Sequence, residues 1–182
     1  MIIKESEMNF GDFDDDSLFY IERSNLYQKL GPGFKTVEFV IKDTNHGIIF
    51  LEAKKSCPNK ANYNISSESK TKFEEYYSSV TEKFITSLQI YLAAILGVHE
   101  NTTEIGEKLR IRNNSLKDMG LKFVLVIKDA ADEEWLAGPR QELNSRLRQI
   151  QKIWKIKVLV LNESLVPKSI TLFAANRLQD NE

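Results

Sequence analysis

Two carboxylates interrupt stretches of sequence that are otherwise apolar. Glu38 lies within the run Val37–Ile41, and Glu52 follows the run Ile48–Leu51. Runs that are apolar at successive positions are typical of strands buried on both faces. A charged group in such a strand costs free energy unless it is paired or binds a metal. Lys54 follows two positions after Glu52, so this region combines acidic ligands with an amine.

The spacing of these residues predicts a β-hairpin. Thr36–Asp43 and Ile48–Lys55 are rich in Val, Ile and Phe, which favours strands. Residues 44–47 contain the Asn and Gly that are typical of a turn. If the loop has three residues, Asp43 pairs with Gly47, and the pairing of the whole hairpin follows from that.

This register predicts that Glu38 lies directly opposite Glu52. Because side chains alternate along a strand, Lys54 points to the same side as Glu52. Two opposed carboxylates repel each other, and a divalent cation between them would remove the repulsion. A shift of one residue would instead place Ala53 opposite Glu38, so the expected site depends on the register.

A third carboxylate, Glu22, is expected to join this pair. The four-residue spacing of Leu18, Glu22, Leu26 and Leu30 predicts a helix over Ser17–Leu30 with Glu22 on its inward stripe. The three glutamates, a backbone carbonyl near Ala53 and water would form an all-oxygen site that suits Mg²⁺ or Mn²⁺. Lys54 would orient the attacking water or stabilise charge that develops on a phosphate.

The remaining pattern predicts an α/β protein with a central mixed β-sheet and helices on both faces. The other predicted elements are a long helix over Ser69–Leu96, a short helix near Ile105–Leu116, a strand over Leu121–Lys128, a helix from Asp132 to about Trp154 and a strand over Ile156–Leu161. Gly138-Pro139 indicates either a late start or a kink in the last of these helices.

Composition narrows the class of protein. The chain has 182 residues, which predicts one domain over 1–182, and its 42% hydrophobic content excludes wholesale disorder. The longest apolar run, Ile90–Val98, is less than half of the roughly 20 residues that span a bilayer. Cys57 is the only cysteine, which excludes an internal disulfide or a cysteine zinc cluster. A cytoplasmic protein without a membrane partner is expected.

The arrangement strand–Glu–turn–strand–Glu-x-Lys, with a glutamate-bearing helix before it and a long helix after it, resembles the PD-(D/E)XK nuclease superfamily. That resemblance covers about 17–126 and implies a restriction-endonuclease-like core of a helix, three strands, a helix and a strand. It implies that Glu38 and Glu52 hold Mg²⁺ (or Mn²⁺), that Lys54 is the motif lysine, and that Glu22 is the helix carboxylate of some members. Gln89 is similar to a helix glutamine found in some branches.

Three features depart from the family pattern. Glu38 stands where an aspartate is usual, and the nearest proline, Pro32, is six residues upstream. Only Gly31–Lys35 separates the expected helix from the glutamate strand, which is too short for the usual first core strand. Three alternatives follow: that strand lies before the helix, it is absent, or the helix is wrongly predicted.

Two functions from different classes follow. The first is a Mg²⁺-dependent endonuclease that acts on nucleic acid, with DNA as the expected substrate, and in which a homodimer or protein partner supplies a second active site. Its backbone-binding residues would be Arg110, Arg112, Arg140, Arg146 and Arg148. The second is a catalytically inactive binding or scaffolding module of the same fold.

Each residue of the site also has a structural alternative. Glu52 and Lys54 would then belong to an ordinary strand emerging into solvent, and Glu38 would lie on an exposed edge. Glu22 would sit on a helix rotated by a quarter turn, with Phe19 and Ile21 inward. The arginines would solvate helix surfaces, as most charge runs do.

Overall fold

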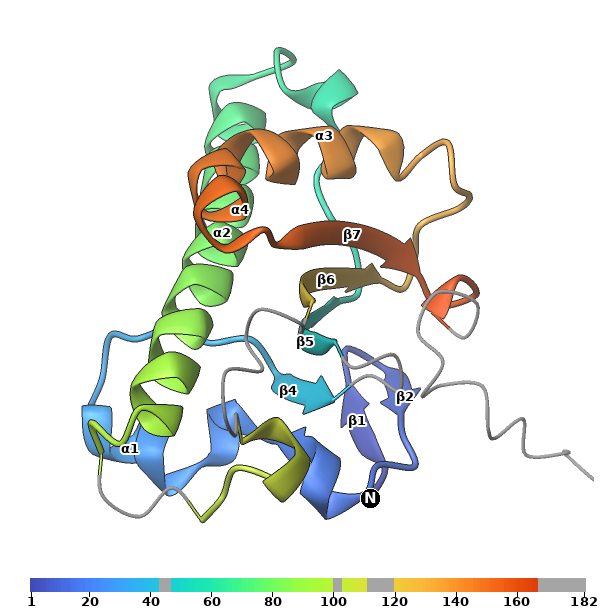
Figure 1. The fold of residues 1–182 in the computed structure, drawn as a ribbon. Coiled ribbons are helices and arrows are strands. Elements are labelled where there is room, and N and C mark those ends of the chain that lie inside the picture. The colour runs from blue at the N-terminus through green and yellow to red at the C-terminus, as the bar shows by residue number, and fades with distance from the viewer. Residues whose placement is uncertain (43–46, 100–102, 111–119, 167–182) are drawn as a thin grey trace, which may run out of the picture.

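A five-stranded mixed sheet forms the centre of the protein (Figure 1). The computed structural model describes all residues except 43–46, 100–102, 111–119 and 167–182. In spatial order, the strands are β3 (Leu18–Phe19), β4 (Phe39–Lys42), β5 (Ile48–Lys54), β6 (Leu121–Ile127) and β7 (Lys157–Asn162). Strand β4 runs antiparallel to both of its neighbours, while β5, β6 and β7 are parallel. The predicted α/β class with a mixed sheet is confirmed.

The β4–β5 hairpin has the predicted register. Phe39 pairs with Leu51, and Lys42 pairs with Ile48, as a three-residue loop requires. The expected pairing of Asp43 with Gly47 lies outside the described residues. The length of the turn therefore predicted the pairing, although both strands are buried at nearly every position.

Strand β4 is shorter than the predicted Thr36–Asp43. The N–H of Val37 donates to Ser87 Oγ at 2.8 Å instead of joining the ladder. One residue later, the N–H of Glu38 donates to the carbonyl of Leu51 at 3.1 Å. The chain therefore enters the sheet at Glu38, whose backbone is fixed by β5 just before the regular strand begins.

The predicted helix over Ser17–Leu30 is wrong. The segment forms a 3-10 turn (Asp15–Ser17), strand β3, a second 3-10 turn (Ile21–Arg23) and only then helix α1 (Asn25–Leu30). Leu18 and Phe19 pair with Ile41 and Val40 of β4 and are both buried, on opposite faces of the sheet. Pairing with a sheet edge therefore outweighs the helical spacing of the leucines. Strand β3 lies before helix α1, and the predicted helix is wrong; these were two of the three alternatives for this segment.

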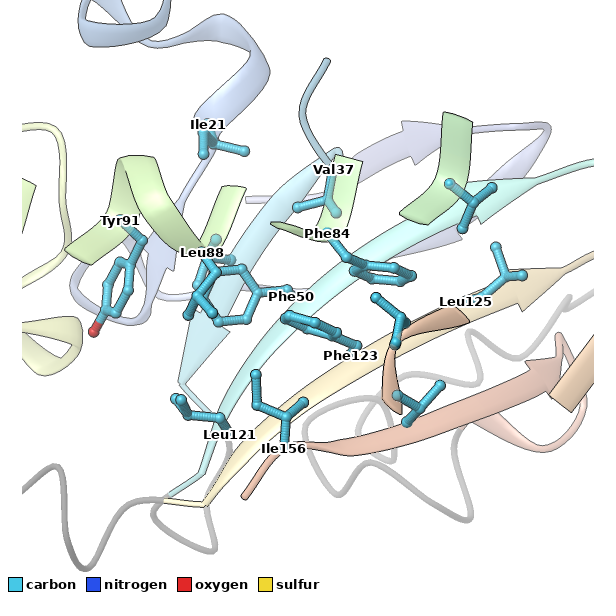
Figure 2. Packing of buried hydrophobic residues seen from close by; sticks show 14 of the residues in the cluster. Ile21, Val37, Phe50, Phe84, Leu88, Tyr91, Leu121, Phe123, Leu125 and Ile156 are labelled. Atoms are coloured by element: carbon cyan, nitrogen blue, oxygen red, sulfur yellow. The ribbon is translucent and has the colours of Figure 1, made fainter. Parts of the chain in front are cut away.

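Helix α2 (Ser67–Ile95) connects β5 to β6 and covers one face of the sheet. Ser66 Oγ accepts the N–H of Ser69 and caps its start, and Gly97 follows its end with φ +74°. Figure 2 shows Phe84 of α2 over Phe123, and the two rings stack with centroids 4.7 Å apart. This packing confirms the predicted long helix and fixes α2 on the face that carries Glu52.

Helices α3 (Ala137–Arg146) and α4 (Arg148–Trp154) follow β6. Leu143 and Leu147 belong to the same core cluster as α2. Helix α3 starts at Ala137, which agrees with the late start, one of the two alternatives for Gly138-Pro139. The Asp132 carboxylate accepts the N–H of Trp135 and therefore caps a turn that precedes this helix. The predicted short helix over Ile105–Leu116 is reduced to a 3-10 turn at Glu107–Leu109, and residues 111–119 lie outside the described part.

The opposite face of the sheet is covered by a hairpin, so the prediction of helices on both faces is wrong for the residues that the structure describes. Strands β1 (Ile3–Glu5) and β2 (Met8–Phe10) lie across that face, away from α2 (Figure 1). Ile3, Met8 and Phe10 alternate with polar residues and point into the core. Within the described ranges, none of the helices has both the length and the apolarity that crossing a membrane requires.

Candidate functional site

Glu38, Glu52 and Lys54 lie on the sheet face that α2 covers. Val40 and Phe50 pack into the α2-side core, and strand alternation places Glu38, Glu52 and Lys54 on that same side. Glu52 is fully buried, and Glu38 is 7% exposed. The alternative of an exposed edge for Glu38 is therefore wrong. Strand β5 does emerge into solvent at its end, as the other alternative expects, because Lys54 is 31% exposed and Lys55 is 58% exposed.

Glu52 is held between two ammonium groups. Its Oε1 lies 2.7 Å from Lys54 Nζ and 2.8 Å from Lys83 Nζ, and its Oε2 accepts a hydrogen bond from Lys83 at 3.1 Å. No donor in the described part of the chain is aligned for a hydrogen bond to Oε1, although that oxygen is buried. Two ammonium groups therefore already approach Glu52 Oε1 within ion-pair distance.

Lys83 of α2 is the functional residue that sequence reasoning missed. Its Nζ is also 3.7 Å from Glu38 Oε1, so a single ammonium group lies within 4 Å of both carboxylates. Burial opposes the charge on Lys83, yet the charge of Glu52 and the hydrogen bond to it raise the pKa of Lys83 above its ordinary value. The detectable signal was its position: Lys83 follows Val80 by three residues and precedes Ser87 by four, on the inward stripe of α2.

The surroundings of Glu38 favour its protonated form. Burial, a hydrogen bond with the Glu22 side chain and the charge of Glu52 raise the pKa of Glu38 to about 8, against the opposing effect of Lys83. Two carboxylates share a hydrogen bond only when one of them is protonated. The hydrogen bond between Glu38 and Glu22 therefore agrees with a protonated Glu38, which is the more deeply buried of the two.

Glu22 reaches the site by a route that differs from the predicted one. It lies in the 3-10 turn Ile21–Arg23 rather than on the inward stripe of a helix, and its side chain is exposed. Phe19 and Ile21 are the buried residues of this segment. The hydrogen bond to Glu38 nevertheless places Glu22 at the rim of the same pocket.

The donor set fits an open Mg²⁺ or Mn²⁺ site better than a closed metal cage. In the part of the chain that the structure describes, no group of three or more His, Cys, Asp or Glu side chains is arranged to hold a metal ion. Mg²⁺ commonly uses one or two carboxylates and keeps several waters. Glu38 and Glu52 supply two carboxylates, and Oε1 of Glu52 is in contact with the ammonium groups of Lys54 and Lys83. An ion would have to displace the Glu38 proton and compete with Lys83.

The backbone carbonyl of Ala53 has a partner. It accepts a hydrogen bond of 2.9 Å from Ser6 Oγ, in the turn of the β1–β2 hairpin. A carbonyl oxygen has two lone pairs, so this contact leaves one for a further ligand. The N-terminal hairpin therefore touches the strand between Glu52 and Lys54 from the other face of the sheet.

The predicted nucleic-acid-binding arginines do not form one set. Arg146 binds Glu74 and Glu142 at 2.6 and 2.7 Å, so it links α2 to α3. Arg110 contacts Glu107 at 2.9 Å, and Arg148 is exposed on α4. Arg140, on α3, is half-buried, and Arg112 lies outside the described residues. Their role in binding nucleic acid stays a prediction.

Two other residues do not add to the chemistry of the site. Gln89, which is similar to a family glutamine, is exposed on α2. Burial raises the pKa of Cys57 to about 11, so its thiol is protonated at neutral pH. Comparisons of the chain with protein-family models, curated proteins and solved structures gave no match.

Proposed function

We propose that the protein is a Mg²⁺- or Mn²⁺-dependent nuclease that hydrolyses phosphodiester bonds. The observation that carries this proposal is the convergence of two buried carboxylates and two lysines in one cluster at the end of β5. Glu38 and Glu52 would hold the metal, with Glu22 at the rim and water completing the shell. Strongly perturbed ionisable groups that meet in one place are typical of active sites.

Each residue of the pocket has a role in this proposal. Lys54 is 31% exposed and lies 2.7 Å from Glu52, so its ammonium group can orient a water molecule toward a bound phosphate. Lys83 holds Glu52 in position from α2. Glu38 would have to give up its proton to act as a ligand, and Glu22 lies within hydrogen-bond reach of it. A bound Mg²⁺ would lower the pKa of water and neutralise charge on the phosphate.

The topology supports the resemblance to the PD-(D/E)XK superfamily without matching it in every part. Strands β3, β4 and β5, helix α2 and strand β6 follow the expected order of three strands, a helix and a strand. Helix α1 lies between β3 and β4, whereas the family places its first helix before the first strand. The glutamate that replaces the usual aspartate, Glu38, is chemically sufficient as a ligand.

Cleavage of nucleic acid by the purified protein tests this function. Single- and double-stranded DNA and RNA are incubated with Mg²⁺ or Mn²⁺ and with the wild type, Lys54→Ala or Lys72→Ala. Lys72 is a matched control because it is an exposed lysine paired with Glu68, at the start of α2. We expect metal-dependent cleavage that Lys54→Ala lowers at least 100-fold, since a positioned catalytic group contributes about that much. Equal cleavage by both variants would indicate a contaminating nuclease.

The position of Lys83 favours a second candidate, a catalytically inactive binding module. Its ammonium group lies within 4 Å of both carboxylates and supplies the positive charge that a metal would otherwise bring. In this case, the pocket is a structural ion-pair network that holds α2 against β5. The two candidates differ in one measurable property, because only the nuclease requires that divalent metal displace the Glu38 proton.

A further inference from the structure

Two lysines from neighbouring strands converge on a single exposed carboxylate beside the candidate site. Glu7 Oε1 lies 2.7 Å from Lys55 Nζ, and Glu7 Oε2 lies 2.8 Å from Lys128 Nζ. Lys55 directly follows β5, and Lys128 directly follows the parallel strand β6. The N–H of Lys128 donates to the carbonyl of Lys54 at 2.9 Å, which fixes the two strand ends against each other. The sheet therefore presents two ammonium groups at a fixed spacing.

The geometry around Glu7 is that of an anion held by two cations. A carboxylate offers two anionic oxygens, and here each binds a different ammonium group. The two non-bridging oxygens of a phosphodiester offer the same pattern to Lys or Arg side chains. The hydrogen bonds and charges of Lys128 and Lys55 lower the pKa of Glu7 to about 2. Glu7 is therefore ionised near neutral pH and competes with a phosphate for the two lysines.

The segment that carries Glu7 is strained. Its ion pair with Lys55 is exposed, whereas Lys128, in the second pair, is 28% exposed. Ser6 and Glu7 form the two-residue turn between β1 and β2, with φ of 49° and 62°. Such turns favour Asn-Gly because both residues must adopt positive φ. Glu7 is 55% exposed and Lys55 is 58% exposed, so water and salt screen their attraction. An incoming phosphate can therefore replace Glu7 without breaking a buried interaction.

We infer that Lys55 and Lys128 form a phosphate clamp for the nucleic-acid backbone, and that Glu7 occupies it as an internal competitor in the free protein. This inference rests on the proposed nuclease function. It identifies two residues that would bind the backbone of the substrate. The clamp lies one residue beyond Lys54, but on the hairpin side of the sheet, since side chains alternate. A nucleic-acid strand that contacts both Lys54 and the clamp must cross this edge of the sheet.

Two further features agree with a bound strand at this edge. A cavity of about 410 Å³ lies beside Lys128 and is lined also by Asn162, Glu163 and Ser164. It gives room for the uncharged part of a nucleotide next to the clamp, while the Glu163 carboxylate would repel a phosphate there. The Ser6 hydroxyl in the same turn binds the Ala53 carbonyl, between Glu52 and Lys54. Movement of the turn away from the lysines would therefore also free that carbonyl.

Binding of DNA without metal tests the clamp separately from cleavage. The anisotropy of a fluorescein-labelled DNA oligonucleotide is measured in EDTA at several salt concentrations, for the wild type and for Glu7→Gln, Glu68→Gln and Lys55→Gln/Lys128→Gln. Glu68 is a matched control because it is an exposed glutamate that pairs with one lysine, Lys72, at 2.6 Å. It lies 15 positions before Lys83 on α2, roughly 22 Å along the helix at 1.5 Å per residue.

We expect Glu7→Gln to tighten DNA binding about tenfold, since two lysines lose their competitor, and Glu68→Gln to change it less than about twofold. The double lysine variant should bind more weakly and should lower the salt slope by about 2, one for each lost phosphate contact. Ile3, Met8 and Phe10 anchor the hairpin independently of Glu7, so Glu7→Gln retains the fold. A circular dichroism spectrum checks this for every variant.

Equal effects of Glu7→Gln and Glu68→Gln would overturn the inference, as would an unchanged salt slope in the double lysine variant. Absence of DNA binding by the wild type and Glu7→Gln at low salt would overturn it as well. The proposed function fails in a different way. Tighter binding by Glu7→Gln without metal-dependent cleavage would retain the clamp and refute the nuclease, whereas cleavage without an effect of Glu7→Gln would refute the clamp alone.

Discussion

The proton on Glu38 makes the stability of the protein depend on pH. The side chain is buried against Glu22 and Glu52, with Lys83 as its nearest cation, and its pKa rises from 4.5 to about 8. The folded state therefore binds one more proton than the unfolded state between these two pH values. Stability is greatest below pH 4.5 with respect to this group, and it falls as the pH rises toward 8.

The size of this effect follows from the shift. Each pKa unit corresponds to about 1.36 kcal/mol, so a shift from 4.5 to about 8 corresponds to about 5 kcal/mol over the whole range. Between pH 6 and pH 8, about 2 to 3 kcal/mol of this is lost. Replacement of Glu38 by glutamine imitates the protonated side chain and cannot ionise. We therefore expect the Glu38→Gln variant to be less sensitive to pH and more stable than the wild type at pH 8.

Urea unfolding at pH 6, 7 and 8 measures this difference. The free energy of unfolding of the wild type should fall by about 2 to 3 kcal/mol across the series, and that of Glu38→Gln should stay level. Glu82→Gln serves as the control, because Glu82 is an exposed glutamate on α2 that pairs with Lys35. Its slope should equal that of the wild type. The argument that Glu38 is protonated would be refuted if the free energy of unfolding of the wild type did not fall with pH, or if that of Glu38→Gln fell equally.

Three further predictions concern the same pocket. Lys83→Ala should lower the free energy of unfolding in urea by about 3 kcal/mol, since it leaves Glu52 with one cation. A Lys83→Ala/Glu52→Ala double variant should lose less stability than the sum of the two single variants. Additive losses would show that the two residues are not coupled. Ser87→Ala should cost about 1 to 3 kcal/mol, because the buried N–H of Val37 loses its partner, and an unchanged midpoint would contradict this. The apparent affinity for Mn²⁺ should rise about tenfold per pH unit below pH 8, since metal competes with the Glu38 proton; a flat profile would indicate that Mn²⁺ binds elsewhere.

The sequence predicted the hairpin and its register because both depend on local patterns. The short turn between β4 and β5 predicts one register, and the structure has that register. This pairing was enough to bring Glu38 and Glu52 to the same face. Helix α2 was also predictable, because its apolar stripe continues over 29 residues between a serine cap and Gly97.

The parts that were missed depend on contacts distant in sequence. Leu18 and Leu26 fit a helical spacing, but the unpaired edge of β4 recruits Leu18 and Phe19 into a strand, and propensity cannot reveal this. Lys83 was missed because it lies within a helix and its partner, Glu52, lies 31 residues earlier. A lysine on an inward stripe is itself a signal that a buried carboxylate faces it, and this signal can be searched for in other sequences.

Titration calorimetry with Mn²⁺ tests the central claim, that Glu38 and Glu52 form a metal site, most directly. The titration is carried out at pH 7 in two buffers with different heats of ionisation, for the wild type, Glu52→Gln and Glu82→Gln. The account predicts one ion bound per chain, release of close to one proton from Glu38, and loss of binding in Glu52→Gln but not in Glu82→Gln. Absence of binding, or binding that is equally strong in Glu52→Gln, would contradict it.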